Sequence, residues 1–201
     1  MTPEKSSKRE GGALSWLAIY REPVVLRMFF LGFSSGLPLL LVLGTLSFWM
    51  REVGVDLKSI GFMSWVGLCW GMKWLWSPLV DKLRIPLLSS RLGQRRAWLL
   101  TAQIGLIVSL ALMAFADPAK SLTLTAALAL TTAFFGATQD IALDAFRIES
   151  GSEEKQAAFA ATYQTGYRLA MIWAGAGALA IAAFFETQFG TAVGWRSAYL
   201  V

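Results

Sequence analysis

The sequence has no histidine, one cysteine and few charged residues, which make up 15% of its 201 positions. A chain without histidine cannot form a Ser-His or Cys-His catalytic pair, a histidine-ligated zinc site or a histidine proton relay. The single cysteine, Cys69, excludes an internal disulfide and a cysteine metal cluster. Ordinary globular chains carry about a quarter charged residues, so the low charge also argues against a soluble domain. We therefore expect no catalytic residues, no metal site and no cofactor.

Long apolar runs take the place of the missing charges. Apolar residues make up 56% of the chain and fall into runs separated by short polar breaks. A helix needs about 20 residues to cross the hydrocarbon core of a bilayer, so each run is a candidate span. The expected spans are residues 24–50, 60–80, 97–116, 122–146 and 159–185, and a sixth run starts at Trp195. The sequence thus predicts an all-α integral membrane protein with five complete transmembrane helices and the start of a sixth.

The basic residues are segregated between the two sides of the predicted membrane. One side holds Lys5, Lys8, Arg9, Arg21, Arg27, Lys82, Arg84, Arg91, Arg95, Arg96, Arg147 and Lys155. The other side holds only Arg51, Lys58, Lys120 and Arg196. Because cytoplasmic loops carry the excess of Lys and Arg, residues 1–23 are predicted to be a cytoplasmic segment, with a short interfacial helix at 13–20. Topology accounts for the basic excess, so nucleic-acid binding is not expected.

The two sets of three helices run in opposite directions, which is typical of the inverted repeats of secondary transporters. The first helix of each set carries small or polar residues in mid-span. They are Ser34, Ser35, Gly36 and Pro38 in the first set, and Gly136, Gln139, Asp140 and Asp144 in the second. Interruptions at corresponding places point to the transport pathway, and a proline inside a helix predicts a kink.

Three charged residues fall well inside predicted spans: Lys73, Asp140 and Arg168. A charge in the middle of a bilayer costs about 2.5–3.5 kcal/mol on insertion scales, so such residues are usually paired or functional. Their similar depth on the same side predicts a cluster around a polar cavity, although long side chains can also snorkel to the interface. Asp144 lies four residues after Asp140 and shares its helix face. With no histidine present, one of these carboxylates is the expected proton carrier.

A metal-dependent enzyme is the alternative interpretation of the same carboxylates. Gly136, Asp140 and Asp144 match the GxxxDxxxD end of the CDP-alcohol phosphotransferase signature, whose carboxylates hold divalent metals. The remainder of that signature requires acidic and basic residues just upstream, and the stretch 121–135 has neither Asp nor Arg. We therefore predict that the protein is not an enzyme.

The loop between the second and third spans resembles the loop motif of the major facilitator superfamily. Asp81 and Lys82 close the second span, and Arg95 and Arg96 open the third. The resemblance implies a gating loop in which Asp81 binds charged neighbours on the cytoplasmic side, with Arg147 as a possible partner. A plain basic loop without a gating role is the alternative.

Four further motifs resemble those of the AmpG-type muropeptide permeases, in the same order along the chain. They are GFSSGLPLLLVLGTLSFWM (32–50), KWLWSPLVDK (73–82), ATQDIALDAFRIE (137–149) and GYRLAM (166–171). The resemblance extends from about Tyr20 to Val201. It implies a major-facilitator-type helical bundle, of which residues 24–201 are the N-terminal six-helix half with a truncated sixth helix.

The function implied by this resemblance is that of an inner-membrane permease of Gram-negative bacteria. Such permeases import anhydromuropeptides, which are peptidoglycan fragments, by alternating access and with the proton gradient. They feed cell-wall recycling and thereby influence β-lactamase induction. On that basis the side chains near the pathway would be Ser34, Ser35, Lys73, Gln139, Asp140 and Arg168. The family has two halves around a central cavity, so the chain would need the missing C-terminal half.

Two other functions stay open from the sequence. One is a major-facilitator carrier or exporter of another amphiphile, such as a drug or an acyl-CoA. The other is an inactive truncated membrane protein.

Overall fold

The fold is taken from a computed structural model, which describes residues 19–200. All regular elements in this range are helical. The interfacial helix expected at 13–20 lies almost wholly outside the described residues. Its last two positions belong to a short 3₁₀ turn, η1 (Ile19–Arg21).

Four helices in the described range are long and apolar enough to cross a bilayer. The first comprises α2 (Pro23–Leu40), η2 (Leu41–Thr45) and α3 (Leu46–Glu52). The next two are α8 (Gln94–Phe115) and α9 (Leu122–Glu149). The fourth comprises α10 (Glu153–Ile172), η5 (Trp173–Gly177) and α11 (Ala178–Phe189). A shorter helix, α12 (Thr191–Leu200), follows and begins four residues before the predicted start of the sixth run.

The second predicted span, 60–80, is not a continuous helix, so the expected count of five complete helices is not confirmed. It is divided into α4 (Leu57–Met63), η3 (Ser64–Gly67), α5 (Leu68–Gly71), η4 (Lys73–Leu75) and α6 (Ser77–Lys82). Glycine destabilises helix interiors, and proline favours the start of a new helix. Three glycines and Pro78 occur in this stretch. A turn of helix, α7 (Leu88–Leu92), then leads into α8.

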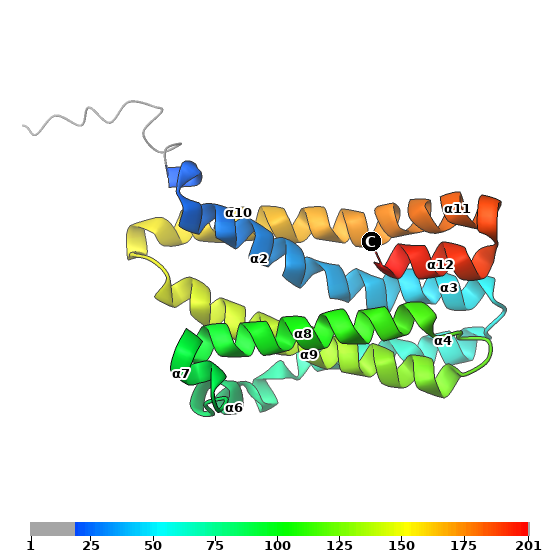
Figure 1. Ribbon diagram of the computed structural model, residues 1–201, viewed down its shortest axis with the longest axis horizontal. Helices are drawn as coiled ribbons and strands as arrows, with labels where there is room; N and C mark the ends of the chain where they lie inside the picture. Colours follow the sequence, from blue (N-terminus) through cyan, green and yellow to red (C-terminus); the bar gives the residue numbers. More distant parts are fainter. Residues whose placement is uncertain (1–18, 201) are drawn as a thin grey trace, which may run out of the picture.

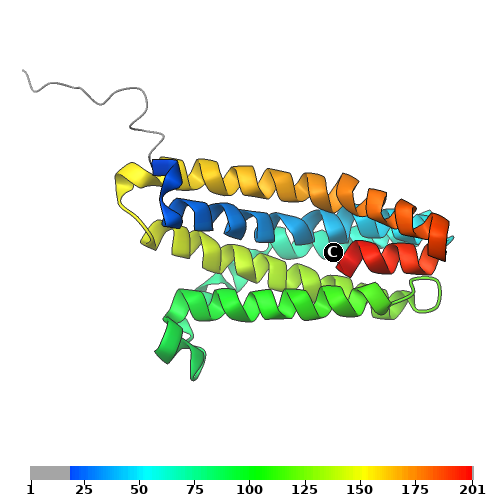
Figure 2. The same cartoon turned by 45° about the horizontal axis from the view of Figure 1, so that its top comes forward.

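The long helices lie side by side along the longest dimension of the molecule (Figure 1). α2 packs against α10, and α8 packs against α9. The broken segment 57–82 runs along α9, and α12 packs against α11 and α8. Figure 2, turned by 45°, shows the same pairing, with α12 returning from the far end of α11.

Glycines allow α2 and α10 to approach each other closely. A Cβ atom placed on Gly32 would overlap the carbonyl oxygen of Tyr163, and one on Gly166 would overlap that of Phe29. Gly36 lies equally close to the backbone of Tyr167. Small residues commonly serve this purpose in membrane helices, because the packing of bare backbones is favourable there. The close approach fixes which side chains of α10 can reach α2.

The interruptions of the helices differ from those predicted. α9 is unbroken through Gly136, Asp140 and Asp144, because a helix tolerates single polar side chains when neighbouring helices satisfy them. Pro38 is followed by the π-helical turn η2, which widens the helix after the missing N–H. A second π turn, η5, lies opposite, and the Thr45 hydroxyl donates to the carbonyl of Ala174. The irregular positions are therefore in the first, second and fifth predicted spans.

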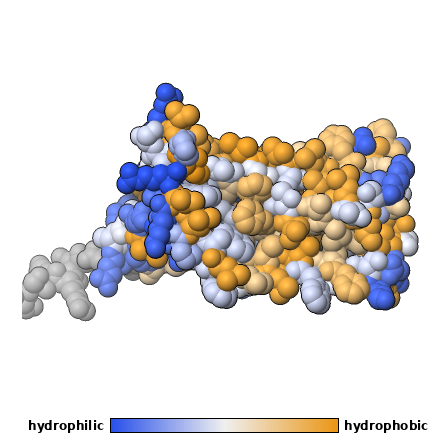
Figure 3. All heavy atoms as spheres, turned by 90° about the horizontal axis from the view of Figure 1, so that it is seen from below, coloured by the Kyte–Doolittle hydropathy of each residue, from blue (hydrophilic) through white to orange (hydrophobic). Residues whose placement is uncertain are grey.

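The surface separates into an apolar band and two polar ends, as Figure 3 shows for one face. One end gathers the start of α2, the 82–94 loop and the junction of α9 with α10, and the other end gathers the remaining turns (Figures 1 and 2). Within the described residues, the basic groups expected on opposite sides of a membrane therefore lie at opposite ends of the bundle. This arrangement is that of a multi-pass membrane protein.

Candidate transport site

A buried carboxylate lies at the centre of the site. Asp140 is on the inner face of α9, and 11% of its side chain is exposed. Ser35, on α2, donates its hydroxyl hydrogen to Oδ1 of Asp140. Because α9 is buried on all sides from Gly136 to Leu143, the carboxylate depends on side chains of other elements for its polar contacts.

Lys73 connects this carboxylate to a second one. The Lys73 ammonium lies 3.8 Å from Oδ2 of Asp140 and 3.8 Å from Oδ2 of Asp144. Exposure of the side chains increases outward, from 11% for Asp140 to 34% for Lys73 and 48% for Asp144. The sequence predicted that Lys73 and the two aspartates share a location, and the structure brings them together. Asp144 is thus the member through which solvent reaches the site.

Arg147 and Tyr163 complete a closed set of contacts. Arg147 lies 3.7 Å from Oδ1 of Asp144, and its guanidinium stacks over the ring of Tyr163 with its carbon 5.6 Å from the ring centre. The Tyr163 hydroxyl is 3.3 Å from Oγ of Ser35, which returns to Asp140. We call these six side chains the charge ring: Ser35, Lys73, Asp140, Asp144, Arg147 and Tyr163.

The charge ring balances its charges. When all four ionisable groups other than Tyr163 are ionised, two positive and two negative side chains cancel. Electrostatic interactions are stronger in a low-dielectric interior than in water, and an unbalanced buried charge is costly. The ring can therefore exchange one charge for another, but the gain or loss of a single charge is unfavourable.

A second polar group lies beside the ring on the same two helices. The Gln139 amide donates to Oγ of Ser34 at 3.0 Å. The carbonyl oxygen of Gln139 is buried and has no hydrogen-bond partner within the described part of the chain. At the preceding residue of α9, the Trp76 indole donates to Oγ1 of Thr138 at 3.2 Å and holds the broken segment against the helix. The free carbonyl oxygen of Gln139 can accept a hydrogen bond from a hydroxyl or an amide N–H.

Arg168 was expected in this cluster, and the structure does not place it there. Its side chain is exposed, whereas Gly166 and Ala170 on the same helix are buried against α2. A helix turns by about 100° per residue, so Arg168 lies on the face opposite to both of these neighbours. The prediction rested on the similar depth of Arg168, Lys73 and Asp140 in the membrane, and depth does not specify how a helix is rotated about its axis. Gly36 and Pro38 are buried packing positions on α2, next to the ring but without a polar side chain to contribute.

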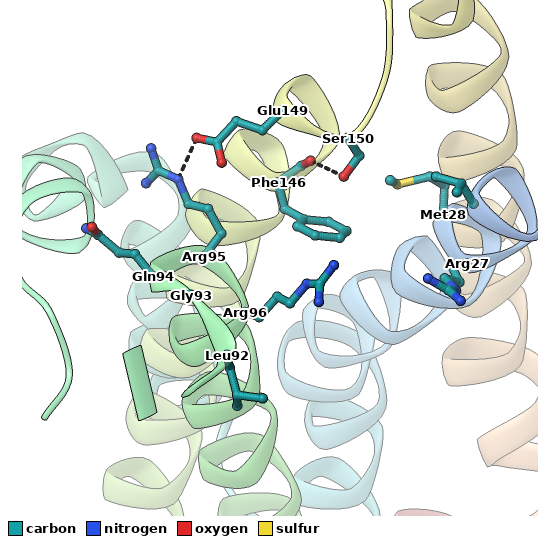
Figure 4. A pocket seen from close by; sticks show the side chains of 11 residues that line it. Arg27, Met28, Leu92, Gly93, Gln94, Arg95, Arg96, Phe146, Glu149 and Ser150 are labelled. Carbon is teal, nitrogen blue, oxygen red and sulfur yellow. Dashed lines mark hydrogen bonds and ion pairs between the residues drawn. The ribbon is translucent and has the colours of Figure 1, made fainter. Parts of the chain in front are cut away.

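The predicted gating loop forms a separate ionic contact at one end of the bundle. Asp81 Oδ1 lies 2.5 Å from a terminal nitrogen of Arg95, and Nε of Arg95 donates to Glu149 at 2.9 Å. Gln94 also donates to the backbone carbonyls of Val80 and Asp81. The broken segment, α8 and α9 are thus connected at this end, as Figure 4 shows for Arg95 and Glu149.

Arg147 is not the partner of Asp81, in contrast to the expectation from the sequence. It contacts Asp144, three residues earlier on α9, and therefore belongs to the charge ring. Arg95 takes its place because the first turn of α8 lies between Asp81 and α9. Lys82 is exposed at the end of α6.

Basic residues also line a hollow beside this contact. The hollow has a volume of about 490 Å³ and lies between the ends of α2, α8 and α9 (Figure 4). Arg96 projects into it over the ring of Phe146, with the guanidinium carbon 5.9 Å from the ring centre, and Arg27 enters from α2. The end predicted to be cytoplasmic is thus electropositive where the helices separate.

Replacing Arg95 with Gln is expected to loosen the loop after α6. The substitution removes the contacts to Asp81 and Glu149, and exposed ion pairs are worth about 0.2–1 kcal/mol each, so trypsin should cleave within residues 82–92 about threefold to tenfold faster. The cleavage rate of the membrane-embedded chain measures the effect. Lys120→Gln, at the other end, serves as the control, and an equal rate in both variants would contradict the role of Arg95.

One member of the charge ring, Tyr163, was not predicted from the sequence. Ser35 was predicted as a pathway residue, although without Asp140 as its hydrogen-bond partner. The signal for Tyr163 was its place three residues before Gly166 on the helix that carries the small-residue contact. Among the side chains that the structure describes, no group of three or more Cys, Asp and Glu is placed to hold a metal ion.

Comparison with known proteins finds one matching family and several named relatives. The family described as acetyl-coenzyme A transporter 1 matches residues 24–126. The anhydromuropeptide permease of Escherichia coli (strain K12) is 42% identical over 184 residues, which are 92% of this chain and 35% of the relative. A putative transporter AmpG 4 of Rickettsia felis is 38% identical over 164 residues, 82% of this chain and 39% of the relative.

A further relative, the putative transporter AmpG 3 of Rickettsia prowazekii, is 32% identical over 182 residues, 90% of this chain and 41% of the relative. The chain thus spans 35% to 41% of the length of these relatives. The helical fold, the apolar band and these matches lead to one conclusion: the chain belongs to the family described as acetyl-coenzyme A transporter 1, and over most of its own length it is similar to relatives named anhydromuropeptide permease and AmpG.

Proposed function

We propose that this chain is the N-terminal part of a secondary transporter that imports anhydromuropeptides from the periplasm into the cytoplasm. The observation that carries the proposal is the charge ring, in which a buried carboxylate on α9 is contacted by Ser35 of α2 and by Lys73 of the broken segment, inside a membrane protein. Ionisable residues inside membrane segments mark substrate and ion pathways by default. The relatives named as muropeptide permeases support the choice of substrate.

Proton coupling is assigned to Asp140 and Asp144. Asp140 is the buried member and Asp144 the exposed one, so a proton can enter at Asp144 and be held at Asp140. Lys73 lies between the two carboxylates and responds to the charge of both. A chain without histidine has few other side chains that can exchange a proton at physiological pH.

Alternating access is assigned to the two ends of the bundle. The ionic contact of Asp81, Arg95 and Glu149 is a candidate cytoplasmic latch, because it joins three helical elements and can break without disturbing the apolar core. The basic excess at the same end supports a cytoplasmic N-terminus and an inner-membrane location. The remaining length of the relatives would supply the second half around the pathway.

Uptake by a chimera tests this function. The chain would replace the matching region of the Escherichia coli permease, so that the remaining length of that relative completes the transporter. We expect right-side-out membrane vesicles or intact cells that contain the chimera to accumulate labelled anhydromuropeptide. A folded chimera that accumulates none would contradict the proposal, and the unmodified relative controls for assembly.

A second candidate substrate is an acyl-CoA, and one observation favours it. Residues 24–126 match the family described as acetyl-coenzyme A transporter 1. An excess of unlabelled acetyl-coenzyme A should leave muropeptide uptake unchanged if the first proposal holds. Strong competition, together with direct uptake of acetyl-coenzyme A, would favour the second candidate.

A further inference from the structure

The charge ring also suggests which part of the substrate it binds. We propose that Lys73 binds a carboxylate of the substrate when Asp140 takes up a proton, so that one proton and one carboxylate enter the ring together. The inference rests on the proposed transport function and deepens it. It identifies the recognised group as an anion of the carboxylate class.

The contacts of Lys73 are the first step of the argument. Its ammonium lies 3.8 Å from an oxygen of each aspartate, which is the outer limit of an ion pair rather than a close hydrogen bond. The other oxygens are already engaged, Oδ1 of Asp140 with Ser35 and Oδ1 of Asp144 with Arg147. The Lys73 side chain is 34% exposed, so its terminal nitrogen is accessible. Lys73 is the more exposed of the two basic groups of the ring, since the Arg147 side chain is 25% exposed and also covers the ring of Tyr163, so an incoming anion reaches Lys73 more readily.

The balance of charge is the second step. Protonation of Asp140 leaves two positive groups, Lys73 and Arg147, against the single negative charge of Asp144. An anion that then binds at Lys73 restores neutrality. Conversely, an anion that arrives while Asp140 is ionised would place an excess negative charge in the site. Because an unbalanced charge is costly in a low-dielectric site, the fully loaded and fully empty states are favoured over the half-loaded ones.

The groups around Asp140 are compatible with this exchange. From α2 it faces the Ser35 hydroxyl, and from α10 it faces Tyr163 and, more distantly, Tyr167. From the broken segment it faces Lys73, and along α9 it faces Asp144. The hydroxyl of Ser35 can donate to the ionised carboxylate and accept from the protonated one, so the hydrogen bond persists in both states. Lys73 is thus the positive group that responds directly to the change.

The functional groups expected on the ligand follow from the side chains in and beside the charge ring. A carboxylate can accept hydrogen bonds from the Lys73 ammonium, and a peptide chain ends in such a group. Gln139 lies next to Asp140 on α9. Its carbonyl oxygen has no hydrogen-bond partner in the described part of the chain and can accept a hydrogen bond from an amide or a hydroxyl of the ligand. A ligand that combines a carboxylate with amide or hydroxyl donors fits both.

Binding by purified chimera tests the exchange, with two ligands of the same scaffold. One is an anhydromuropeptide with free peptide carboxylates, and the other is the same compound with those carboxylates converted to amides. We expect the chimera to bind the acid about tenfold to a hundredfold more tightly than the amide, since a charge-assisted hydrogen bond in a buried site has that worth. The preference should grow as the pH falls from about 8 to about 5.5, while peptide carboxylates stay ionised.

Two variants separate the roles of the ring members. In Lys73→Gln the preference for the acid should be lost, and Lys73→Arg should retain it. Asp140→Asn mimics the protonated carboxyl, so it should bind the acid tightly with no dependence on pH. Lys120→Gln, in which an exposed lysine at the other end is altered, should behave as the unmodified chimera does. Each variant is first checked for folding by its elution as a single species in detergent.

The outcomes distinguish this inference from the proposed function. Equal binding of acid and amide, or an unchanged preference in Lys73→Gln, would overturn the inference while uptake of muropeptides still stood. The converse result is a folded chimera that transports no muropeptide but binds the acid more tightly than the amide in a way that requires Lys73. That result would overturn the proposal of muropeptide transport and support the inference about Lys73.

Discussion

Replacement of Asp140 with Asn should abolish the dependence of uptake on the proton gradient. One proton that moves down a gradient of one pH unit releases about 1.4 kcal/mol, which supports about a tenfold accumulation of substrate. The chimera should therefore accumulate muropeptide about tenfold for each unit of imposed gradient and for each proton coupled. An asparagine side chain has nearly the same shape but cannot carry a proton, so the variant should only equilibrate its substrate.

The measurement is the ratio of internal to external substrate at several imposed pH gradients, with the membrane potential held at zero. Asp117→Asn is the matched control, because Asp117 is a partly exposed carboxylate in a turn at the other end of the bundle, paired with Lys120. Accumulation by Asp140→Asn that still increased with the gradient would rule out Asp140 as the coupling group.

Replacement of Gly32 with Val should prevent the first and fifth predicted spans from packing. Any Cβ at Gly32 would overlap the backbone of Tyr163, which a rotamer change cannot relieve. Overpacking of a core typically costs about 1–3 kcal/mol, and here the overlap is with the main chain, so we expect the upper part of that range or more. Tyr163 would also move away from Ser35, and the charge ring would open.

The yield and thermal stability of the folded chain in detergent measure this effect. Gly61→Val is the matched control, since a Cβ at Gly61 in α4 would meet no atom within 4 Å. A Gly32→Val variant as stable as Gly61→Val would show that the two helices do not pack as described. In that event the placement of Tyr163 in the charge ring would also be withdrawn.

Much of the helical organisation follows from the sequence. A bilayer requires an uninterrupted apolar helix of about 20 residues, so the positions of the long helices were predictable within a few residues. The second span is the exception, because hydropathy measures how apolar a segment is and not whether its backbone stays regular. Its glycines and Pro78 were visible, yet only the packing of the segment against α9 shows where it divides.

The candidate site, too, was predictable from the sequence only in part. The functional importance of Lys73 and Asp140 was predictable, because a charge inside a membrane is costly in any arrangement of the helices. Which residues complete the site depends on how each helix is rotated about its axis. Arg168 and Tyr163 lie on the same helix five residues apart, and the tyrosine rather than the arginine faces α2.

By itself, the sequence determined that the chain is a helical membrane protein with most of its basic residues on one side and a few costly charges within its spans. Those features depend on the composition of each segment and on the solvent around it. Only the tertiary structure decided that Asp140 is held by Ser35, that Arg147 pairs with Asp144 rather than with Asp81, and that Tyr163 completes the ring. The physical reason is that side-chain pairing depends on which helices are neighbours, and here the close approach of backbones at glycines determines the neighbours of α2.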